Sequence, residues 1–329
     1  MLYRRLGQSD LEVSVITMGC WAIAGDRFWG PQDEGDAIGA LRMAVECGIN
    51  LIDIAEAYGD GRSEELVGKA FKDMREKVII ATKVSVDHLR PEDVRAACEA
   101  SLKRLGTDYI DVYYIHWPNW DIPVSETLGA MEGLKEEGKI RIIGCSNFGR
   151  RDLTKLLQYG RVEVIQLPYS LLWRAVEYEI LPTCVENGVS VACYSPLLHG
   201  LLTGKFRSIN DVPPGRARTR HFSSSREGTR HGEPGAEKET FEAIEKIREI
   251  CQEAGLPMTQ VAIAWLLRQE GIATVTAGAR NPKQIRANAS AASLELPRDV
   301  VEALTSVTEP LKEKLGSNAD LWQSDSRIR

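Results

Sequence analysis

The sequence predicts a (β/α)8 barrel of the TIM type, with an N-terminal β-hairpin closing its bottom and a long loop after the seventh strand. Short β-branched apolar runs alternate with amphipathic segments along all 329 residues, a length that fits one large barrel. The runs are nearly continuously hydrophobic, which is typical of parallel strands covered on both faces. We therefore expect one barrel domain over residues 1–329, with eight strands at residues 15–19, 50–55, 78–84, 110–116, 142–147, 164–170, 190–196 and 274–278.

The segments between these runs carry start and stop signals of helices. Pro91 and Pro123 stand where two helices should begin, and Gly48, Gly106 and Gly138 follow the expected ends of three. Proline at the beginning and glycine just past the end is the usual asymmetry of helix termini. Helices are expected between the strands and, after the last strand, over residues 297–307.

Two further segments do not follow the repeat. Residues 1–14 alternate polar and apolar side chains around a turn at residues 7–10, which predicts the β-hairpin. Residues 200–237 are rich in Gly, Pro, Ser and Arg and show no periodicity. A loop of this length is either disordered or functional, and its place after the seventh strand makes it a candidate lid over the catalytic rim.

Composition excludes several classes of protein. The net charge of −6 and the lack of a long basic run argue against a nucleic-acid partner. No signal peptide and no run of about 18 apolar residues is recognisable, so no membrane partner is expected. Seven scattered cysteines without a CxxC pair are typical of reduced, buried thiols in a cytoplasmic protein, and the five histidines show no metal-ligand spacing.

Four polar residues stand at or just past the ends of the second, third and fourth strands: Asp53, Tyr58, Lys83 and His116. All strands of a parallel barrel end on one rim, and that rim carries the chemistry. Reduction of a carbonyl needs a hydride on carbon and a proton on oxygen. A tyrosine can give the proton, a lysine ammonium lowers the tyrosine pKa, an aspartate holds the lysine, and a neutral histidine orients the carbonyl.

Each residue also has a purely structural interpretation when taken alone. Asp53 suits a cap, Tyr58 a rim aromatic, and His116 a buried histidine with satisfied hydrogen bonds. Lys83 lies inside an apolar strand, where a cation needs a partner, so structural pairing and function stay open. Their joint occurrence on three neighbouring strands favours catalysis.

Several motifs resemble the aldo-keto reductase superfamily, from Arg5 to about Leu304. They are GINLIDIAEAYGDGRSEELVG, ATKV, YIHWP, LKEEGKIRIIGCSNF, QLPYSLL and YSPLLHGLLTGKF. The resemblance implies a barrel, NADPH-dependent reduction of aldehydes or ketones, and the tetrad Asp53, Tyr58, Lys83 and His116 in the roles above. GLLTGKF and GARNP are closer to the bacterial branch near the general-stress-protein reductases than to the mammalian aldose reductases.

The resemblance also implies where the cofactor binds. There is no GxGxxG after the first strand, which argues against a Rossmann domain. By resemblance, Ser146, Asn147 and Gln166 contact the nicotinamide carboxamide and Tyr194 stacks on its ring; an N-cap and a rim aromatic are the structural alternatives. The remaining candidates around the nicotinamide and the phosphates are Ser195, Leu197, Gly200, Leu202, Lys205 and Gly278.

The adenosine end should lie just before a helix that follows the eighth strand, because a helix N-terminus favours anions. Arg280 is the candidate for the 2′-phosphate, and Gln284 and Asn288 share one helix face and match positions that contact the ribose phosphate and the adenine. Better-known members carry a lysine at Gly278 and an arginine at Gln284, a proline at Ala277 and often an acidic residue at Ala287. These departures weaken the case for a strong preference for NADPH over NADH. By resemblance NADPH is still favoured as the cofactor, and NADH is possible.

Large aromatic residues on the rim loops predict an apolar substrate pocket, although loop packing would explain each of them equally: Trp21, Phe28, Trp29, Trp117 and Trp173. A small carbonyl compound is the expected partner, and the oligomeric state stays open. Two alternative functions remain. One is a barrel lyase that uses Lys83 as a Schiff-base nucleophile. The other is a redox-sensing subunit that binds NADPH and turns over little.

Overall fold

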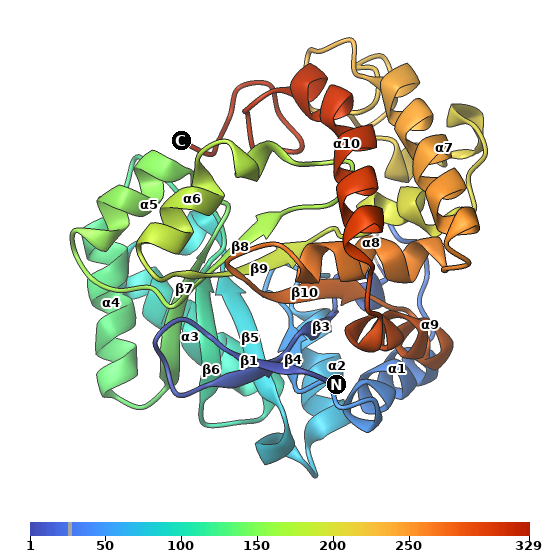
Figure 1. Cartoon of the computed structure of the whole chain (residues 1–329). Coiled ribbons are helices and arrows are strands. Elements are labelled where there is room, and N and C mark those ends of the chain that lie inside the picture. Colours follow the sequence, from blue (N-terminus) through green and yellow to red (C-terminus); the bar gives the residue numbers. More distant parts are fainter. Residues whose placement is uncertain (26–27) are drawn as a thin grey trace.

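In the computed structural model, which describes residues 1–25 and 28–329, eight parallel strands close into a barrel and confirm the predicted fold class (Figure 1). The strands follow each other around the barrel in chain order, and β10 closes it against β3. Their bounds agree with the predicted runs within a few residues: β3 (Ile16–Gly19), β4 (Leu51–Asp53), β5 (Ile79–Val84), β6 (Ile110–Ile115), β7 (Ile140–Ser146), β8 (Val164–Pro168), β9 (Ser190–Tyr194) and β10 (Ile272–Gly278).

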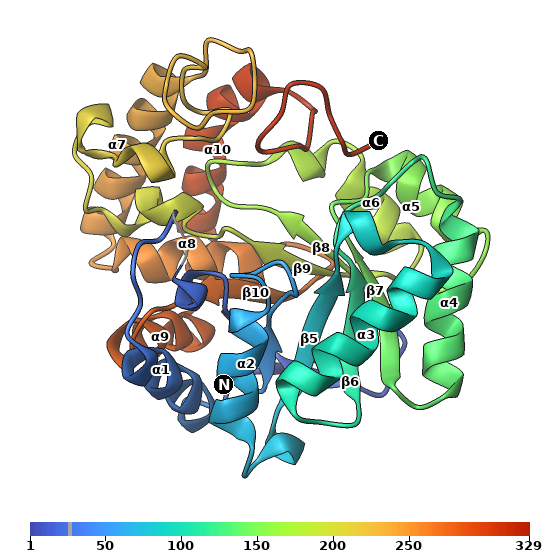
Figure 2. The same cartoon turned by 180° about the vertical axis from the view of Figure 1, so that it is seen from behind.

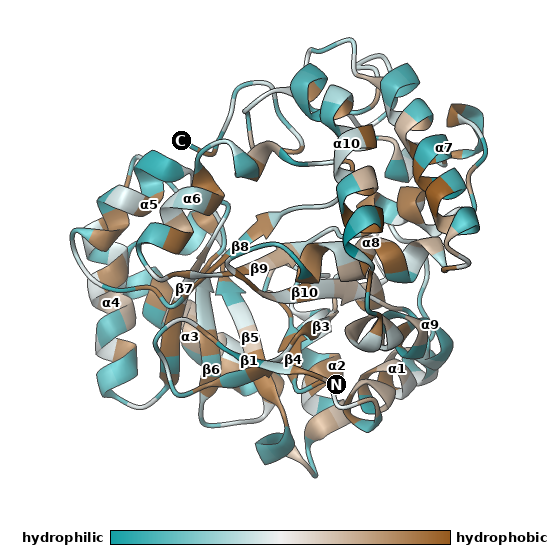
Figure 3. Ribbon diagram, in the orientation of Figure 1, coloured by the Kyte–Doolittle hydropathy of each residue, from teal (hydrophilic) through white to brown (hydrophobic). Residues whose placement is uncertain are grey.

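Helices surround the barrel on all sides (Figures 1 and 2). In Figure 3 these helices carry both hydrophobic and hydrophilic colour, as expected of elements with one face on the barrel and the other in water. They are α1 (Glu34–Glu46), α2 (Arg62–Phe71), α3 (Pro91–Leu105), α4 (Val124–Glu136), α5 (Arg150–Leu157), α6 (Ile180–Glu186), α7 (Glu237–Glu253), α8 (Met258–Leu267), α9 (Pro282–Ala289) and α10 (Arg298–Leu315).

The last helix is longer than the sequence predicted. Residues 297–307 were expected to be helical, but α10 continues to Leu315 and includes Pro310. The apolar period continues past the proline, and Leu311 and Leu315 are buried. Packing against α7 therefore outweighs the loss of one helical hydrogen bond at the proline.

The N-terminal hairpin closes the bottom of the barrel, as predicted. Strands β1 (Tyr3–Arg5) and β2 (Glu12–Ser14) pair antiparallel, and Leu6 and Leu11 are buried among inward-facing residues of the barrel strands. The Ser14 amide donates to Asn50 Oδ1 at 2.7 Å, just before β4 begins. With its bottom closed, the barrel is left open only at the C-terminal ends of its strands.

The long loop of residues 200–237 is an ordered wall of this open end. It contains three short 3-10 helices: η5 (Leu198–Thr203), which starts before it, η6 (Ile209–Asp211) and η7 (Pro214–Arg216). Arg220 is buried and donates to the carbonyls of Leu315 and Asn318, at 3.2 and 2.8 Å. The loop is thereby fastened to the C-terminal tail, which lies across the same end of the barrel.

All seven cysteines are free thiols, and all except Cys47 are buried. Burial is also the main cause that raises the pKa of Cys98 to about 12. In the described part of the chain, no helix has both the length and the apolar character that a membrane crossing requires.

Gly68 lies at a close contact between α2 and the end of α3. A Cβ at Gly68 would lie 2.6 Å from the carbonyl oxygen of Leu105. Gly68→Ala should therefore lower the free energy of unfolding by ~1–3 kcal/mol, since overpacking forces the backbone to shift. Gly129 lies inside α4 with nothing within 4 Å of such a Cβ, so Gly129→Ala should stabilise by about 0.5–1 kcal/mol. Urea denaturation of both variants checks the pair, and a Gly68→Ala midpoint at or above that of the native chain would contradict the packing.

Candidate active site

The four predicted catalytic side chains converge at the open end of the barrel. Lys83 Nζ lies 2.8 Å from Asp53 Oδ1, 2.6 Å from the carbonyl oxygen of Ile54 and 3.2 Å from the hydroxyl of Tyr58. Asp53 ends β4, Lys83 lies near the end of β5, and the parallel register of these strands brings the two side chains together. All three donors of the ammonium group are thus engaged, one of them on the tyrosine hydroxyl.

Burial and the ion pair set the charge states of this group. Burial alone would lower the pKa of Lys83, but the neighbouring Asp53 carboxylate and the Tyr58 hydroxyl raise it above its ordinary value. Burial raises the pKa of Tyr58, and the Lys83 ammonium opposes that rise. The sequence predicted the lowering by Lys83, but the effect of burial is larger, so the pKa of Tyr58 lies above its ordinary value. Tyr58 is consequently a protonated phenol that can give up its proton, next to a cation that stabilises the resulting phenolate.

His116 faces the tyrosine from the end of β6. The centroids of the Tyr58 and His116 rings are 5.8 Å apart, with an angle of 77° between the rings. Burial and the Lys83 cation lower the pKa of His116 to about 3. Its imidazole is therefore neutral at physiological pH and can donate one hydrogen bond to a carbonyl oxygen.

These groups lie at one end of a pocket of about 790 Å³ that occupies the open end of the barrel. Three predicted site residues do not line it: Lys83, which lies beneath Tyr58, and Leu202 and Trp173. The other predicted residues do: Trp21, Phe28, Trp29, Asp53, Tyr58, His116, Trp117, Ser146, Asn147, Gln166, Tyr194, Ser195, Leu197, Gly200, Lys205, Gly278, Arg280, Gln284 and Asn288.

Leu202 and Trp173 were expected to line the pocket, and both turn away from it for the same reason. Leu202 is completely buried in the core, and Trp173 is 1% exposed, with its ring centroid 5.4 Å from that of His221. Both lie on loops after strands, where the sequence does not show whether a side chain turns toward the pocket or behind its wall.

The polar residues around the barrel axis form a connected network. Tyr194 donates from its hydroxyl to Asn147 Oδ1 at 2.9 Å, and Asn147 Nδ2 donates to Ser146 Oγ at 3.0 Å. Gln166 Nε2 donates to Asp53 Oδ1 at 2.8 Å. Asn147 is held with a positive φ of 61°, a conformation that asparagine tolerates better than most residues. Amide and hydroxyl groups fixed in this way suit a planar carboxamide beside the Tyr194 ring.

Cations gather along the rest of the pocket wall. Lys205 and Arg216 have no carboxylate within ion-pair distance among the described residues. Burial lowers the pKa of both side chains, and their cationic neighbours lower it further. Gly200 adopts a φ of 98°, and a Cβ there would lie 2.9 Å from Lys205 Nζ. A narrow cradle with two cations that pair with no carboxylate of the described residues fits a pyrophosphate, so the donor set is suited to a dinucleotide.

Arg280, Gln284 and Asn288 lie together where β10 leads into α9. Asn281 caps this helix, since its Oδ1 accepts from the Gln284 amide at 3.0 Å. Gln284 Oε1 accepts from the Arg280 amide at 2.8 Å, and Asn288 Nδ2 donates to the Gly278 carbonyl at 3.1 Å. The Arg280 side chain turns toward residues 29–32.

Aromatic rings form the wall next to Tyr58. Trp21 stacks on Tyr58 with 6.2 Å between ring centroids, and Trp29 meets Trp21 edge-on at 5.5 Å. Trp322 of the C-terminal tail stacks on His199 at 5.2 Å. These rings leave an apolar approach to the tyrosine hydroxyl.

The pocket wall also contains polar residues outside the predicted set, among them Arg216, Arg327, His199 and Thr276. Arg327 lies 3.8 Å above the Trp117 ring and pairs with Asp320, and His199 has a buried Nε2 without a hydrogen-bond partner among the described residues. Thr276 lies on β10 and faces the pocket. Arg327 belongs to an irregular tail without periodicity, so no sequence signal pointed to it, whereas His199 lies within the motif YSPLLHGLLTGKF.

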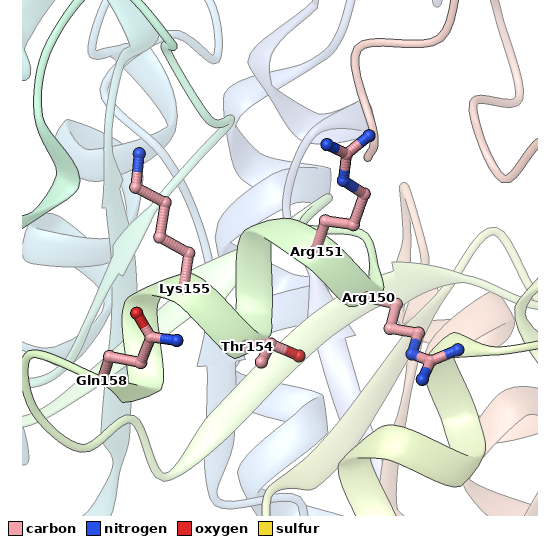
Figure 4. A pocket seen from close by; sticks show the side chains of 5 residues that line it. All are labelled: Arg150, Arg151, Thr154, Lys155 and Gln158. Atoms are coloured by element: carbon pink, nitrogen blue, oxygen red, sulfur yellow. The ribbon is translucent and has the colours of Figure 1, made fainter.

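A second hollow lies on the outer surface of α5, away from the barrel mouth. Its lining side chains come from this one helix and the residue after it, and they diverge instead of facing a common point (Figure 4). They are Arg150, Arg151, Thr154, Lys155 and Gln158. These side chains do not form a catalytic or ligand-binding cluster.

Comparison with known proteins agrees with this geometry. Residues 15–309 match the model of the Aldo/keto reductase family. An NADH-specific methylglyoxal reductase of Escherichia coli strain K12 is 36% identical, over 91% of this chain and 98% of that protein. The aldo-keto reductase YhdN of Bacillus subtilis strain 168 is also 36% identical, over 87% of both chains.

Solved structures give the same result. The glycerol dehydrogenase AKR11B4 from Gluconobacter oxydans superimposes with a TM-score of 0.81 and 29% identity, over 94% of this chain and 95% of that one. An aldo-keto reductase from Klebsiella pneumoniae in complex with NADPH superimposes with a TM-score of 0.74 and 28% identity, over 94% of this chain and 96% of that one.

Proposed function

Because this chain belongs to the aldo/keto reductase family, whose members bind NAD(P)H and act on carbonyl substrates, we propose that it reduces aldehydes or ketones to alcohols with Tyr58 as the general acid. The contact between Lys83 Nζ and the Tyr58 hydroxyl, 3.2 Å long and at the edge of the pocket, carries this proposal. It supports the proposal because a proton donor lies beside the cation that would stabilise its conjugate base, at the edge of the pocket.

The residues divide the work as follows. Ser146, Asn147 and Gln166 would hold the nicotinamide carboxamide, and Lys205 with Arg216 the pyrophosphate. When bound, the reduced nicotinamide supplies a hydride to the carbonyl carbon. Tyr58 donates its phenolic proton to the carbonyl oxygen. Lys83 remains protonated and stabilises the phenolate, while the neutral His116 imidazole orients the same oxygen.

The ion pair argues against a lyase that forms a Schiff base through Lys83. A Schiff-base lysine must lose its proton to attack a carbonyl. Lys83 is completely buried, bonded to three acceptors, and its pKa is raised. Its ammonium group is thus held in the charged, non-nucleophilic form.

Consumption of NADPH and of NADH with a panel of reactive carbonyls tests the proposal. Methylglyoxal comes first, because a relative that is 36% identical is named for it. We expect oxidation of the cofactor that depends on the carbonyl. Tight cofactor binding without turnover on any carbonyl would favour the redox-sensing subunit, and absence of binding would contradict the proposal as a whole.

The pKa shifts predict how the rate depends on pH. His116 is already neutral above a pKa of about 3 and Tyr58 titrates above its ordinary value of 10, so neither group changes charge between pH 5 and 9. We expect kcat/KM for reduction to be flat over this range and to fall at higher pH, when Tyr58 loses its proton. Initial rates at fixed ionic strength measure this profile. An inflection near pH 6.5 that disappears in His116→Gln would contradict the lowered pKa of this histidine.

A further inference from the structure

Each of the three guanidinium nitrogens of Arg280 donates one hydrogen bond to the segment of residues 28–32. Arg280 Nε donates to Gln32 Oε1 at 2.6 Å, Nη1 donates to the Trp29 carbonyl at 2.8 Å, and Nη2 donates to the Pro31 carbonyl. In return, Gln32 Nε2 donates to the Arg280 carbonyl at 3.0 Å. Every nitrogen of the guanidinium group is therefore already bonded within the protein.

The segment that Arg280 holds lies between two walls of the cofactor groove. The Arg216 guanidinium carbon lies 5.7 Å from the centroid of the Trp29 ring, and a Cβ at Gly215 would lie 3.3 Å from the Phe28 carbonyl oxygen. On the other side, Arg280 joins the segment to the turn between β10 and α9. Residues 28–32 thus bridge the loop that follows β9 and the adenosine end of the groove.

Another cation of the pocket wall approaches Arg280 from the loop after β9: Arg216, whose pKa is lowered by burial and by the Arg280 charge. Of the residues that β10, α9 and the turn between them contribute to the pocket wall in the described chain, Arg280 alone is charged. Gln284 turns its Oε1 to the Arg280 amide. Arg286, farther along α9, contacts Met43 and does not line the pocket.

We propose that Arg280 is a latch that fastens residues 28–32 across the cofactor groove, and that the 2′-phosphate of NADP(H) competes with this segment for the guanidinium group. This inference rests on the proposed function. NAD(H), with a 2′-hydroxyl, binds with the latch closed. A 2′-phosphate that takes the N–H groups already bonded must break hydrogen bonds to Gln32 and to the carbonyls of Trp29 and Pro31. Arg280 and Gln32 together therefore set the cofactor preference, and they shift it toward NADH.

Two substitutions at Gln32 give opposite expected effects. Gln32→Ala removes the side-chain half of the latch, so 2′,5′-ADP should bind about tenfold more tightly, with 5′-AMP unchanged within about twofold. Gln32→Glu converts the bond to Arg280 into an ion pair and should weaken 2′,5′-ADP binding. Arg286→Ala is the matched control, because it removes a cation of the same helix outside the pocket and should change neither affinity.

Calorimetric titration of the full chain with 5′-AMP, 2′,5′-ADP, NADH and NADPH measures these affinities. Hydrogen–deuterium exchange gives a second readout: 2′,5′-ADP should speed exchange of the amides of residues 28–32, and 5′-AMP should not. The latch is refuted by a Gln32→Ala variant that binds 2′,5′-ADP no better than the native chain, or by exchange that slows equally with both nucleotides. If neither 5′-AMP nor NADH binds to the native chain, the proposed function itself fails, and with it the role of the latch toward a cofactor.

Discussion

Tyr58→Phe is expected to lower kcat for carbonyl reduction by a factor of roughly 10²–10⁴, the usual contribution of a positioned general acid. The substitution removes one hydroxyl group and with it the 3.2 Å hydrogen bond from Lys83 Nζ. The ring remains, so the stacking with Trp21 and the edge-on contact with His116 are kept. Only the proton donor is lost, and the dissociation constants of NADPH and NADH should stay within about twofold of the native values.

Stopped-flow or steady-state rates, combined with cofactor titrations by fluorescence, measure the two quantities separately. Tyr159→Phe is a matched control, since that tyrosine is exposed, follows α5 and does not line the pocket. A Tyr58→Phe variant with the native turnover rate would remove Tyr58 from the mechanism. A parallel loss of cofactor binding would assign the hydroxyl to binding instead of proton transfer.

The barrel and the tetrad were predictable because both depend on local patterns. Each strand is one apolar run in the sequence. The strands of a parallel barrel end on a common rim, so polar residues at those ends come together independently of how the side chains pack elsewhere. The confirmed strands from β3 to β10 and the contacts among Asp53, Lys83 and Tyr58 follow from this rule.

The loops did not follow from such a rule. Trp173 and Leu202 were expected in the pocket and turn into the core, because the direction of a loop side chain depends on contacts with distant segments. For the same reason, the sequence could not show that Arg280 bonds to residues 29–32, which lie almost 250 positions earlier. The residue type and position of Arg280 suggested a phosphate ligand. The segment of residues 28–32, which would compete with the phosphate for the guanidinium group, is visible only in the fold.

Asp53→Leu is expected to lower the free energy of unfolding by ~3–5 kcal/mol at pH 7, because it leaves the buried Lys83 ammonium without its counter-charge. Lys83 is 0% exposed and Asp53 is 4% exposed, so water cannot replace the carboxylate. Gln166 also loses the acceptor of its hydrogen bond. Urea denaturation followed by circular dichroism measures the loss, and a change below about 1 kcal/mol would show that the pair is not desolvated in the way the structure indicates.

The pH dependence of the free energy of unfolding distinguishes two causes of instability in Asp53→Leu, an unpaired Lys83 ammonium group and a simple loss of packing. In the native chain the pKa of Lys83 is raised. The protonated lysine therefore stabilises the fold fully at pH values below the pKa that Lys83 has in the unfolded chain, and this stabilisation is lost as the pH rises through its pKa in the folded chain. Without Asp53, burial should depress the pKa of Lys83, and the unfolded chain then binds more protons than the folded one. The stability of Asp53→Leu should therefore increase from pH 7 to pH 10, a range over which Lys83 leaves the stability of the native chain nearly unchanged.

The double variant Asp53→Leu/Lys83→Met separates the effect of the ion pair on stability from its effect on proton transfer. Removing both charges leaves no unpaired ion, so most of the lost stability should return, as is common when a buried ion pair is replaced by apolar residues. Activity should not return with it, because Tyr58 then lacks the ammonium group that stabilises its phenolate. A stable but inactive double variant would show that the chain keeps this ion pair for proton transfer and not for folding. Recovery of activity along with stability would mean that Tyr58 works without the lysine.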